Sequence, residues 1–135
     1  MHLHTYGNHP VACAAAIKNI QILQDEKLVQ NAAEMGAYFL EGLKNLEKHP
    51  IVGEARGSGL WLALDFTSDK KTRAVFPINR VNNIIARARD RGLLVKTMGA
   101  ALEIAPPLII HKDDIDLTVE ILDQCISEEE NAMGV

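Results

Sequence analysis

The sequence predicts one α+β domain, in which a small, largely antiparallel sheet carries helices packed on one face. Three observations lead to this fold class. The chain has 135 residues, and the hydrophobic 47% of them are enough to bury one core. Four segments repeat apolar residues at helical spacing. Between them lie short apolar runs bounded by glycine, proline and polar residues, as is typical of strands.

Four helices are predicted over residues 10–24, 27–47, 80–91 and 112–126. Pro10 suits the first turn of the first helix, and the alanines that follow would allow another element to approach closely. His49 and Pro50 end the second helix, and Gly92 closes the third. Asp113 and Asp114 favour the start of the last helix, because acidic side chains stabilise a helix N-terminus.

The predicted strands lie in two parts of the chain. Residues 51–59 contain three glycines and are interpreted as a loop or a bent strand, and residues 60–66 follow as a strand. Residues 93–96 and 102–105 are predicted to be two short strands, joined as a hairpin by a turn at residues 98–100. Two consecutive prolines stop the second of these strands.

Charge and hydropathy exclude several functional classes. The 14 basic and 18 acidic residues give a net charge of -4, and no basic run exceeds two residues, which argues against a nucleic-acid surface. The longest apolar stretches are far shorter than the roughly 20 residues that span a bilayer, so no membrane segment is expected. The first ten residues lack the charged and apolar regions of a signal peptide, and we expect a cytoplasmic protein.

The cysteines and the N-terminal histidines show no metal-ligand pattern. Cys13 and Cys125 have no Cys-x-x-Cys or zinc-ligand spacing around them, and we expect both to be buried and reduced. His2, His4 and His9 could in principle bind zinc, but no acidic or cysteine partner lies near them. They are therefore interpreted as loop residues, and no metal site is expected.

Three motifs in a fixed order carry a family resemblance. They are TYGNHPVACAAA at residues 5–16, GEARGSGL at residues 53–60 and APPLII at residues 105–110. Together they resemble the class III aminotransferases of the ω-type, which use pyridoxal phosphate. The resemblance extends from about residue 2 to residue 126 and corresponds to the C-terminal third or so of such an enzyme.

The resemblance implies a domain organisation. Residues 1–9 would be a loop coming from the large domain, and residues 10–24 a connector helix that leans on that domain. Residues 25–127 would form the C-terminal small domain of a fold-type I enzyme that depends on pyridoxal phosphate. Residues 128–135 are expected to fray.

The resemblance also implies an activity and an assembly for the parent enzyme. Such an enzyme would be a homodimer and would move an amino group from an amine or ω-amino acid to a keto acid such as pyruvate. In that family the Schiff-base lysine and the aspartate that pairs with the pyridinium nitrogen belong to the large domain. The lysines of this chain fall at helix positions and in polar turns. We therefore expect the chain alone to be inactive; the alternative is a non-catalytic module that stands alone or self-associates through the Ala-rich first helix.

Thr5 is the cofactor-binding candidate. It stands where the family places a threonine whose hydroxyl and amide hold the cofactor phosphate across the dimer interface. The alternative is that Thr5 only turns the chain ahead of Pro10. Relatives often have Ser-Gly or Gly-Gly after the Thr-aromatic pair, whereas Gly7 and Asn8 follow Tyr6 here, and asparagine tolerates a positive φ.

Lys96 and Glu103 are the substrate-binding candidates. Relatives that act on α-amino acids often carry a carboxylate-binding arginine where this chain has Glu103, and a carboxylate cannot hold a carboxylate. Relatives of the ω-type carry a mobile arginine at the position of Lys96, which keeps the positive charge. We expect Lys96 to meet the acidic end of an amino or keto acid, while Glu103 faces an amine or solvent. The alternative is two exposed charges of one hairpin.

Arg56 belongs to the Arg-Gly-x-Gly-Leu part of the second motif. The glycines of this motif suit close backbone packing. For Arg56 itself we favour an anchor that hydrogen-bonds neighbouring carbonyls over a contact with substrate.

Overall fold

The structure, a computed structural model, describes residues 7–135 of the chain. Its elements are, in chain order, α1 (Pro10–Asp25), α2 (Leu28–Lys44), the short 3₁₀ helix η1 (Asn45–Lys48), β1 (Val52–Ser58), β2 (Trp61–Asp69), β3 (Ala74–Val75), α3 (Ile78–Asp90), β4 (Lys96–Met98), β5 (Ala101–Ile104) and α4 (Lys112–Met133). All four predicted helices are present. Their bounds lie close to the expected ones except at the end of α4.

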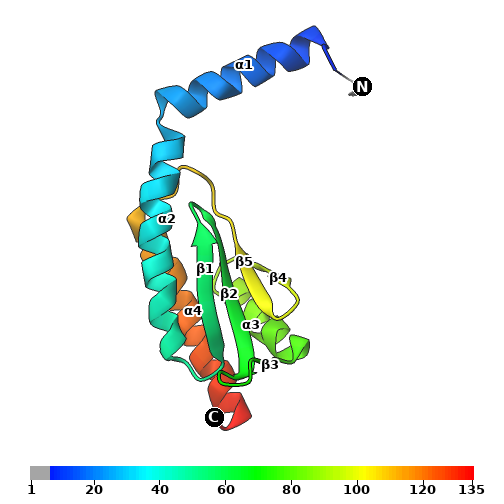
Figure 1. The fold of residues 1–135 in the computed structure, drawn as a ribbon, viewed down its shortest axis with the longest axis vertical. Coiled ribbons are helices and arrows are strands. Elements are labelled where there is room, and N and C mark those ends of the chain that lie inside the picture. Colours follow the sequence, from blue (N-terminus) through cyan, green and yellow to red (C-terminus); the bar gives the residue numbers. More distant parts are fainter. Residues whose placement is uncertain (1–6) are drawn as a thin grey trace.

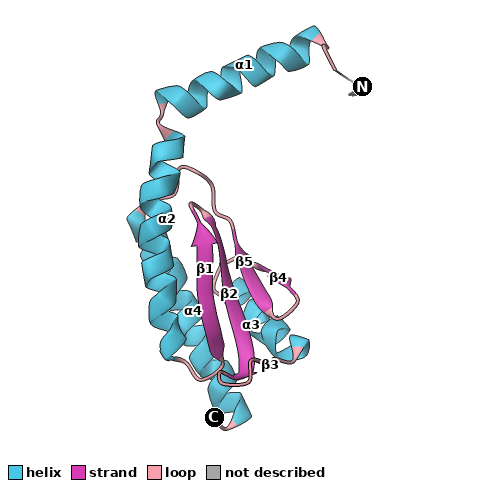
Figure 2. Ribbon diagram, in the orientation of Figure 1, coloured by secondary structure: helices cyan, strands magenta, loops and turns pink. Residues whose placement is uncertain are grey.

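The strands form one small antiparallel sheet in the order β1-β2-β5-β4, with the two-residue β3 paired to the end of β2. Helices α2, α3 and α4 lie together against one face of this sheet (Figures 1 and 2). The predicted fold class is therefore confirmed. No helix of residues 7–135 covers the opposite face of the sheet.

The alternation of side chains along β2 explains which face is covered. Leu62, Leu64 and Phe66 are buried, whereas Ala63 and Asp65 between them are only half-buried, because successive side chains point to opposite faces of a strand. The buried face meets apolar positions of the three helices, which recur every three or four residues: Phe39, Leu43, Val81, Ile84, Ala88, Ile115, Leu122 and Ile126.

The turn between β1 and β2 packs directly under α2. Gly59 has a φ of 54°, a conformation that side chains with a Cβ rarely adopt. A Cβ placed on Gly36 of α2 would lie 2.2 Å from the carbonyl oxygen of Gly59, so the helix and the turn touch backbone to backbone. The predicted close packing of the Arg-Gly-x-Gly-Leu glycines is thus found here. The turn leads directly into Trp61, the first residue of β2.

The predicted hairpin at the end of the sheet is present with a small shift of its strands. Lys96 pairs with Glu103 and Met98 with Ala101, so that Gly99 and its neighbour make the turn. Gly99 has a φ of 67°, which fits a tight turn. Both strands are therefore one to three residues nearer to the turn than expected.

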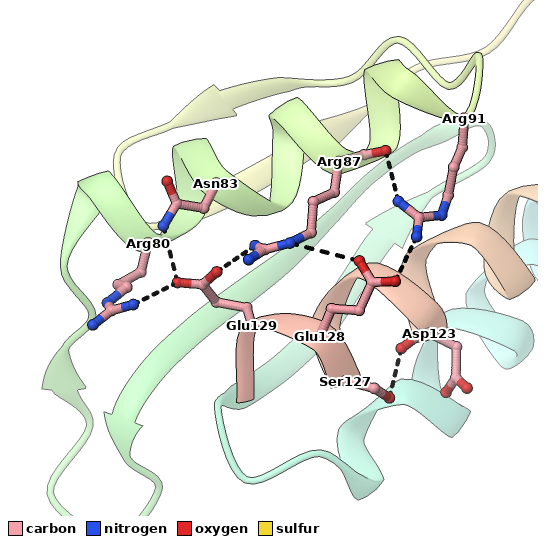
Figure 3. A network of polar contacts seen from close by, with 8 residues as sticks. All are labelled: Arg80, Asn83, Arg87, Arg91, Asp123, Ser127, Glu128 and Glu129. Atoms are coloured by element: carbon pink, nitrogen blue, oxygen red, sulfur yellow. Dashed lines mark hydrogen bonds and ion pairs between the residues drawn. The ribbon is translucent and has the colours of Figure 1, made fainter. Parts of the chain in front are cut away.

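The end of α4 differs from the expected frayed tail over residues 128–135. The helix continues to Met133, because Glu129 and Glu130 are buried and hydrogen-bonded. Arg80, Asn83 and Arg87 of α3 converge on Glu129 (Figure 3). The apolar periodicity of α4 could not predict this longer helix, because its last turns are held by ion pairs with another element.

Glu130 ties the same helix to the other side of the domain. Its Oε2 lies 2.9 Å from Nδ1 of His49, and its Oε1 accepts a hydrogen bond of 3.4 Å from the backbone N–H of Ile51. The other ring nitrogen of His49 lies 3.0 Å from Oδ1 of Asp123. The two consecutive glutamates therefore join α4 to α3 and to the segment that leads into β1.

Helix α1 extends away from the sheet and its helices (Figure 1). None of its residues is buried. Cys13 lies on this helix and is exposed, so the expectation of two buried cysteines is wrong for Cys13 and confirmed for Cys125. Burial of Cys13 would need a partner that covers α1. Among the described residues, no helix is both long and apolar enough to cross a membrane.

Candidate functional site

The uncovered face of the sheet places four residues in one row across four strands. The strand register sets Arg56 of β1 opposite Ala63 of β2, Ala63 opposite Glu103 of β5, and Glu103 opposite Lys96 of β4. Three charged side chains from distant parts of the sequence therefore share one face. Trp61 lies two residues before Ala63 and projects from the same face.

Glu103 is the centre of this row because both of its carboxylate oxygens are engaged. Lys96 Nζ lies 2.8 Å from Oε2, and the indole N–H of Trp61 donates a hydrogen bond of 3.0 Å to Oε1. The Glu103 side chain is only 13% exposed, whereas that of Lys96 is 73% exposed. The structure thus brings both predicted substrate-binding residues together and adds Trp61 to them.

The pKa of Glu103 reflects these two partners. The hydrogen bond from Lys96 lowers the pKa, partial burial raises it, and the hydrogen bond from Trp61 lowers it again. The net result is a pKa below the ordinary value of a glutamate. Glu103 therefore carries its negative charge at neutral pH.

Arg56 pairs with Asp65 on the neighbouring strand. The structure thus gives Arg56 a carboxylate partner and not the backbone carbonyls that we expected. The pair belongs to the same uncovered face, since Asp65 follows Trp61 and Ala63 at intervals of two residues. Arg56 and Lys96, the two cations of the row, each have a carboxylate beside them.

A hollow of about 750 Å³ lies on this face. Side chains of β1, β2 and the β4–β5 hairpin line it, and those with polar or large apolar groups include Arg56, Trp61, Asp65, Met98 and Glu103. Trp61 and Met98 are 68% and 65% exposed, which is high for large apolar side chains. Charged and apolar groups thus surround one open depression, as is common at ligand sites.

Sequence reasoning overlooked Trp61 and Asp65. The available signal was that Trp61 is the single tryptophan of the chain and directly follows the Gly-x-Gly-Leu turn, but its contact with Glu103 joins residues 42 positions apart. Thr5 lies outside the described residues, as do His2 and His4. Among residues 7–135, no group of three histidine, cysteine or acidic side chains could hold a metal ion.

None of the described lysines has the surroundings that Schiff-base chemistry favours. A lysine that binds an aldehyde must lose its proton, which enzymes favour by removing the amine from water or by placing a positive charge nearby. All eight lysines of the chain lie within residues 7–135, and every one of them is exposed. No step involving the cofactor can therefore be assigned to them.

The comparison with known families decides where this domain belongs. The family model described as "Aminotransferase class-III" matches residues 1–126. The chain belongs to the class III aminotransferases. The recognition made from the three motifs is thereby confirmed.

Characterised relatives of this aminotransferase chain are much longer. It is 37% identical over 129 residues to the putrescine–pyruvate aminotransferase of Pseudomonas aeruginosa, with 94% of this chain and 28% of the relative covered. It is 36% identical over 126 residues to the ornithine aminotransferase of Brevibacillus brevis, with 93% of this chain and 29% of the relative covered. The chain thus spans less than a third of the length of these relatives.

Solved structures lead to the same family. An amine transaminase from an uncultivated Pseudomonas species, determined in its PLP-bound internal aldimine form, aligns with a TM-score of 0.89 and 40% identity. An (S)-enantioselective ω-transaminase from Thermomicrobium roseum aligns with a TM-score of 0.86 and 40% identity. The alignments cover 95% and 96% of this chain but 30% and 29% of those chains.

Proposed function

We propose that this chain is the C-terminal small domain of a class III aminotransferase that transfers an amino group from an amine or ω-amino acid to a keto acid such as pyruvate. The observation that carries the proposal is the match of nearly the whole chain to under a third of each aminotransferase relative. The parent enzyme would use pyridoxal phosphate, which supplies an electron sink for the substrate carbon.

The proposal includes that the chain alone does not transaminate. Its described residues contain no buried lysine, and its open sheet face forms only one wall of a site. The large domain of the parent would supply the Schiff-base lysine and the opposite wall. Helix α1 would connect to that domain, which accounts for a helix without a buried residue.

Within the parent, Lys96 would meet the carboxylate of the keto acid, and Glu103 would set the charge balance around it. Thr5 would donate its hydroxyl and amide hydrogens to the phosphate of the cofactor in the other subunit of a homodimer. For Thr5 the test is cofactor affinity in the intact enzyme: Thr5→Ala should weaken it, while Thr5→Ser should preserve it. Equal cofactor affinity of the Thr5→Ala and Thr5→Ser variants would exclude a role of the Thr5 hydroxyl in phosphate binding.

A chimera tests the function as a whole. In the Pseudomonas aeruginosa relative, the segment that matches this chain is replaced by this chain, and alanine formation from pyruvate is measured with several amine donors. We expect transfer by the chimera and none by the 135-residue chain alone. The relative without its matching segment is the control.

Two results would contradict the proposal. One is a chimera that folds and binds the cofactor but transfers no amino group. The other is transfer by the chain alone, which borohydride reduction and peptide mapping would trace to one of its lysines. Either result separates the role of this chain from that of the large domain.

A non-catalytic, self-associating module is the second candidate. The observation that favours it is the exposure of Val11, Ile17 and Ile20 on α1, at 72%, 58% and 53%. Apolar side chains in such number on one helix promote association when no other domain covers them. In this case the chain would bind a second copy of itself through α1.

A further inference from the structure

We propose that Glu103, held by Trp61, is the binding group for the distal ammonium of a diamine substrate, and that Lys96 occupies this position when no diamine is bound. The inference rests on the proposed function and narrows it to a class of amine donor. A diamine offers one amine for transfer and a second, charged amine for recognition. The uncovered face of the sheet holds the groups that would recognise the second one.

The first step of the argument is the way in which Glu103 is oriented. The indole N–H of Trp61 donates a hydrogen bond of 3.0 Å to Oε1 of Glu103, which leaves Oε2 as the oxygen available to a cation. Only 13% of the Glu103 side chain is exposed, so its carboxylate is held in place on a strand. A fixed and largely covered carboxylate discriminates for positive charge more strongly than a solvated one.

The second step is that an alkylammonium already occupies this oxygen. Lys96 Nζ lies 2.8 Å from Oε2, at the end of a four-carbon stem. The side chain of Lys96 is 73% exposed, and it can turn into water at small cost. A diamine that takes its place exchanges one ammonium for another and leaves no buried charge alone.

The third step is that a carboxylate would fit this position less well. A carboxylate placed at Oε2 of Glu103 would bring a second negative charge close to it, whereas Lys96 remains free to meet the keto acid when no diamine is bound. Arg56, the other cation of the row, is already paired with Asp65. Like-charge repulsion therefore favours an ammonium ligand at Glu103.

The fourth step is that apolar surface lies beside the carboxylate. Trp61 and Met98 line the same hollow and are exposed over about two thirds of their surface. The methylene chain of a diamine could lie on these side chains and remove apolar area from water. A short diamine thus matches both the charge and the apolar part of the site.

The test is a titration of the 135-residue chain with 1,4-diaminobutane at constant ionic strength, followed by the NMR signal of the indole N–H. Trp61 is the single tryptophan, so there is one such signal and its source is known. We expect a saturable shift with the diamine and none with 1-butanol. Pyruvate is titrated in parallel as the carboxylate probe.

The variants should change the affinity in opposite directions. Glu103→Gln keeps the shape but removes the charge, and should weaken binding about tenfold or more. Lys96→Met removes the competing ammonium and should strengthen binding several-fold. Glu54→Gln is the matched control, because Glu54 lines the same hollow, and its affinity should stay unchanged. Dispersed amide spectra verify that each variant is folded.

Three results would overturn the inference: equal diamine affinity of Glu103→Gln and the unchanged chain, weaker diamine binding by Lys96→Met, or a pyruvate shift that persists in Lys96→Met. The last result would show that Glu103 itself accepts a carboxylate, whereas a pyruvate shift that depends on Lys96 is what the proposed function expects. In the chimera, Glu103→Gln should raise KM for the diamine but not for 1-aminobutane. An active chimera without that difference leaves the proposed function intact and refutes the ammonium site, whereas an inactive chimera does not affect the titration.

Discussion

At the scale of single residues, Gly36 is the position where the structure leaves least space. In an exposed helix, an alanine in place of a glycine stabilises by about 1 kcal/mol. Here the new Cβ would lie 2.2 Å from the carbonyl oxygen of Gly59 and 2.7 Å from its Cα, and backbone atoms cannot turn aside. The close approach therefore outweighs the helix propensity.

We expect Gly36→Ala to lower the free energy of unfolding by about 2 kcal/mol, measured by urea denaturation. Gly42→Ala on the same helix is the control, because its Cβ would meet only the side-chain methyl group of Val119, at 3.0 Å. The loss in this second variant should be clearly smaller. A Gly36→Ala variant as stable as the original chain would show that α2 and the β1–β2 turn are not in backbone contact.

Lys96 allows a second test at the residue scale, in the chimera that carries this chain. Lys96→Ala should raise KM for pyruvate about tenfold, because a charge-assisted contact to the carboxylate is lost. The KM for a neutral amine should change much less, since such a donor has no carboxylate. Steady-state kinetics with both substrates decide this, and equal effects on the two would exclude the carboxylate role of Lys96.

At the scale of elements, the contact between α3 and α4 depends on one buried charge. Glu129 accepts hydrogen bonds from Arg80 and Asn83, both at 3.1 Å, and pairs with Arg87 (Figure 3). Its side chain is fully buried. Removal of the charge of Glu129 leaves Arg80 and Arg87, whose side chains are 36% and 28% exposed, without the carboxylate that lies between them, which is destabilising.

Glu129→Gln should therefore lower the free energy of unfolding by about 3 kcal/mol at neutral pH, again by urea denaturation. Glu120→Gln provides the control on the same helix, because Glu120 is exposed and its side chain accepts a hydrogen bond of 3.2 Å from the exposed side chain of Gln124. We expect its effect to stay below about 0.5 kcal/mol. Equal stability of both variants would contradict a stabilising role of the buried charge.

The pH dependence of this effect has a definite sign. Burial raises the pKa of Glu129, but the hydrogen bonds from Arg87, Asn83 and Arg80 outweigh it, and the pKa lies below its ordinary value of 4.5. The charged form thus stabilises the folded state fully above that value. The difference between the original chain and Glu129→Gln should shrink as pH falls below 4.5 through the lowered pKa. A difference independent of pH in this range would argue against ionisation as its cause.

At the scale of the whole molecule, α1 is the one described helix without a buried residue. Its apolar side chains face solvent, and it extends away from the domain (Figure 1). In the proposed parent, the large domain would cover this helix. Without that domain, the same surface is available to a second copy of the chain.

We expect the 135-residue chain to self-associate as its concentration rises, and a charged substitution on α1, Ile17→Glu, to reduce the association. Val75→Glu is the control, because Val75 is 85% exposed but lies on β3, far from α1 in the chain. Light scattering across a concentration series is the measurement. A monomer at high concentration would exclude the self-associating module.

Much of this domain follows from short-range pattern. Apolar spacing is a local property, and it located all four helices, including the one over Pro10–Asp25. The glycines of the second motif indicated a close backbone contact, and Gly99 marked the hairpin turn. Lys96 and Glu103 could be placed on one hairpin in advance because its turn is a local feature, but their ion pair depends on the register that the structure shows.

Contacts between distant segments could not be predicted from such local patterns. The hydrogen bond from Trp61 to Glu103 joins two strands whose pairing no local pattern reveals, and the burial of Glu129 depends on arginines of another helix. Cys13 was expected inside because its surroundings are apolar, yet it is exposed since α1 extends away from the sheet and its helices in the part of the chain that the structure describes. Periodicity reports which side chains prefer to leave water, whereas the packing of whole elements decides which of them do so and which charges meet.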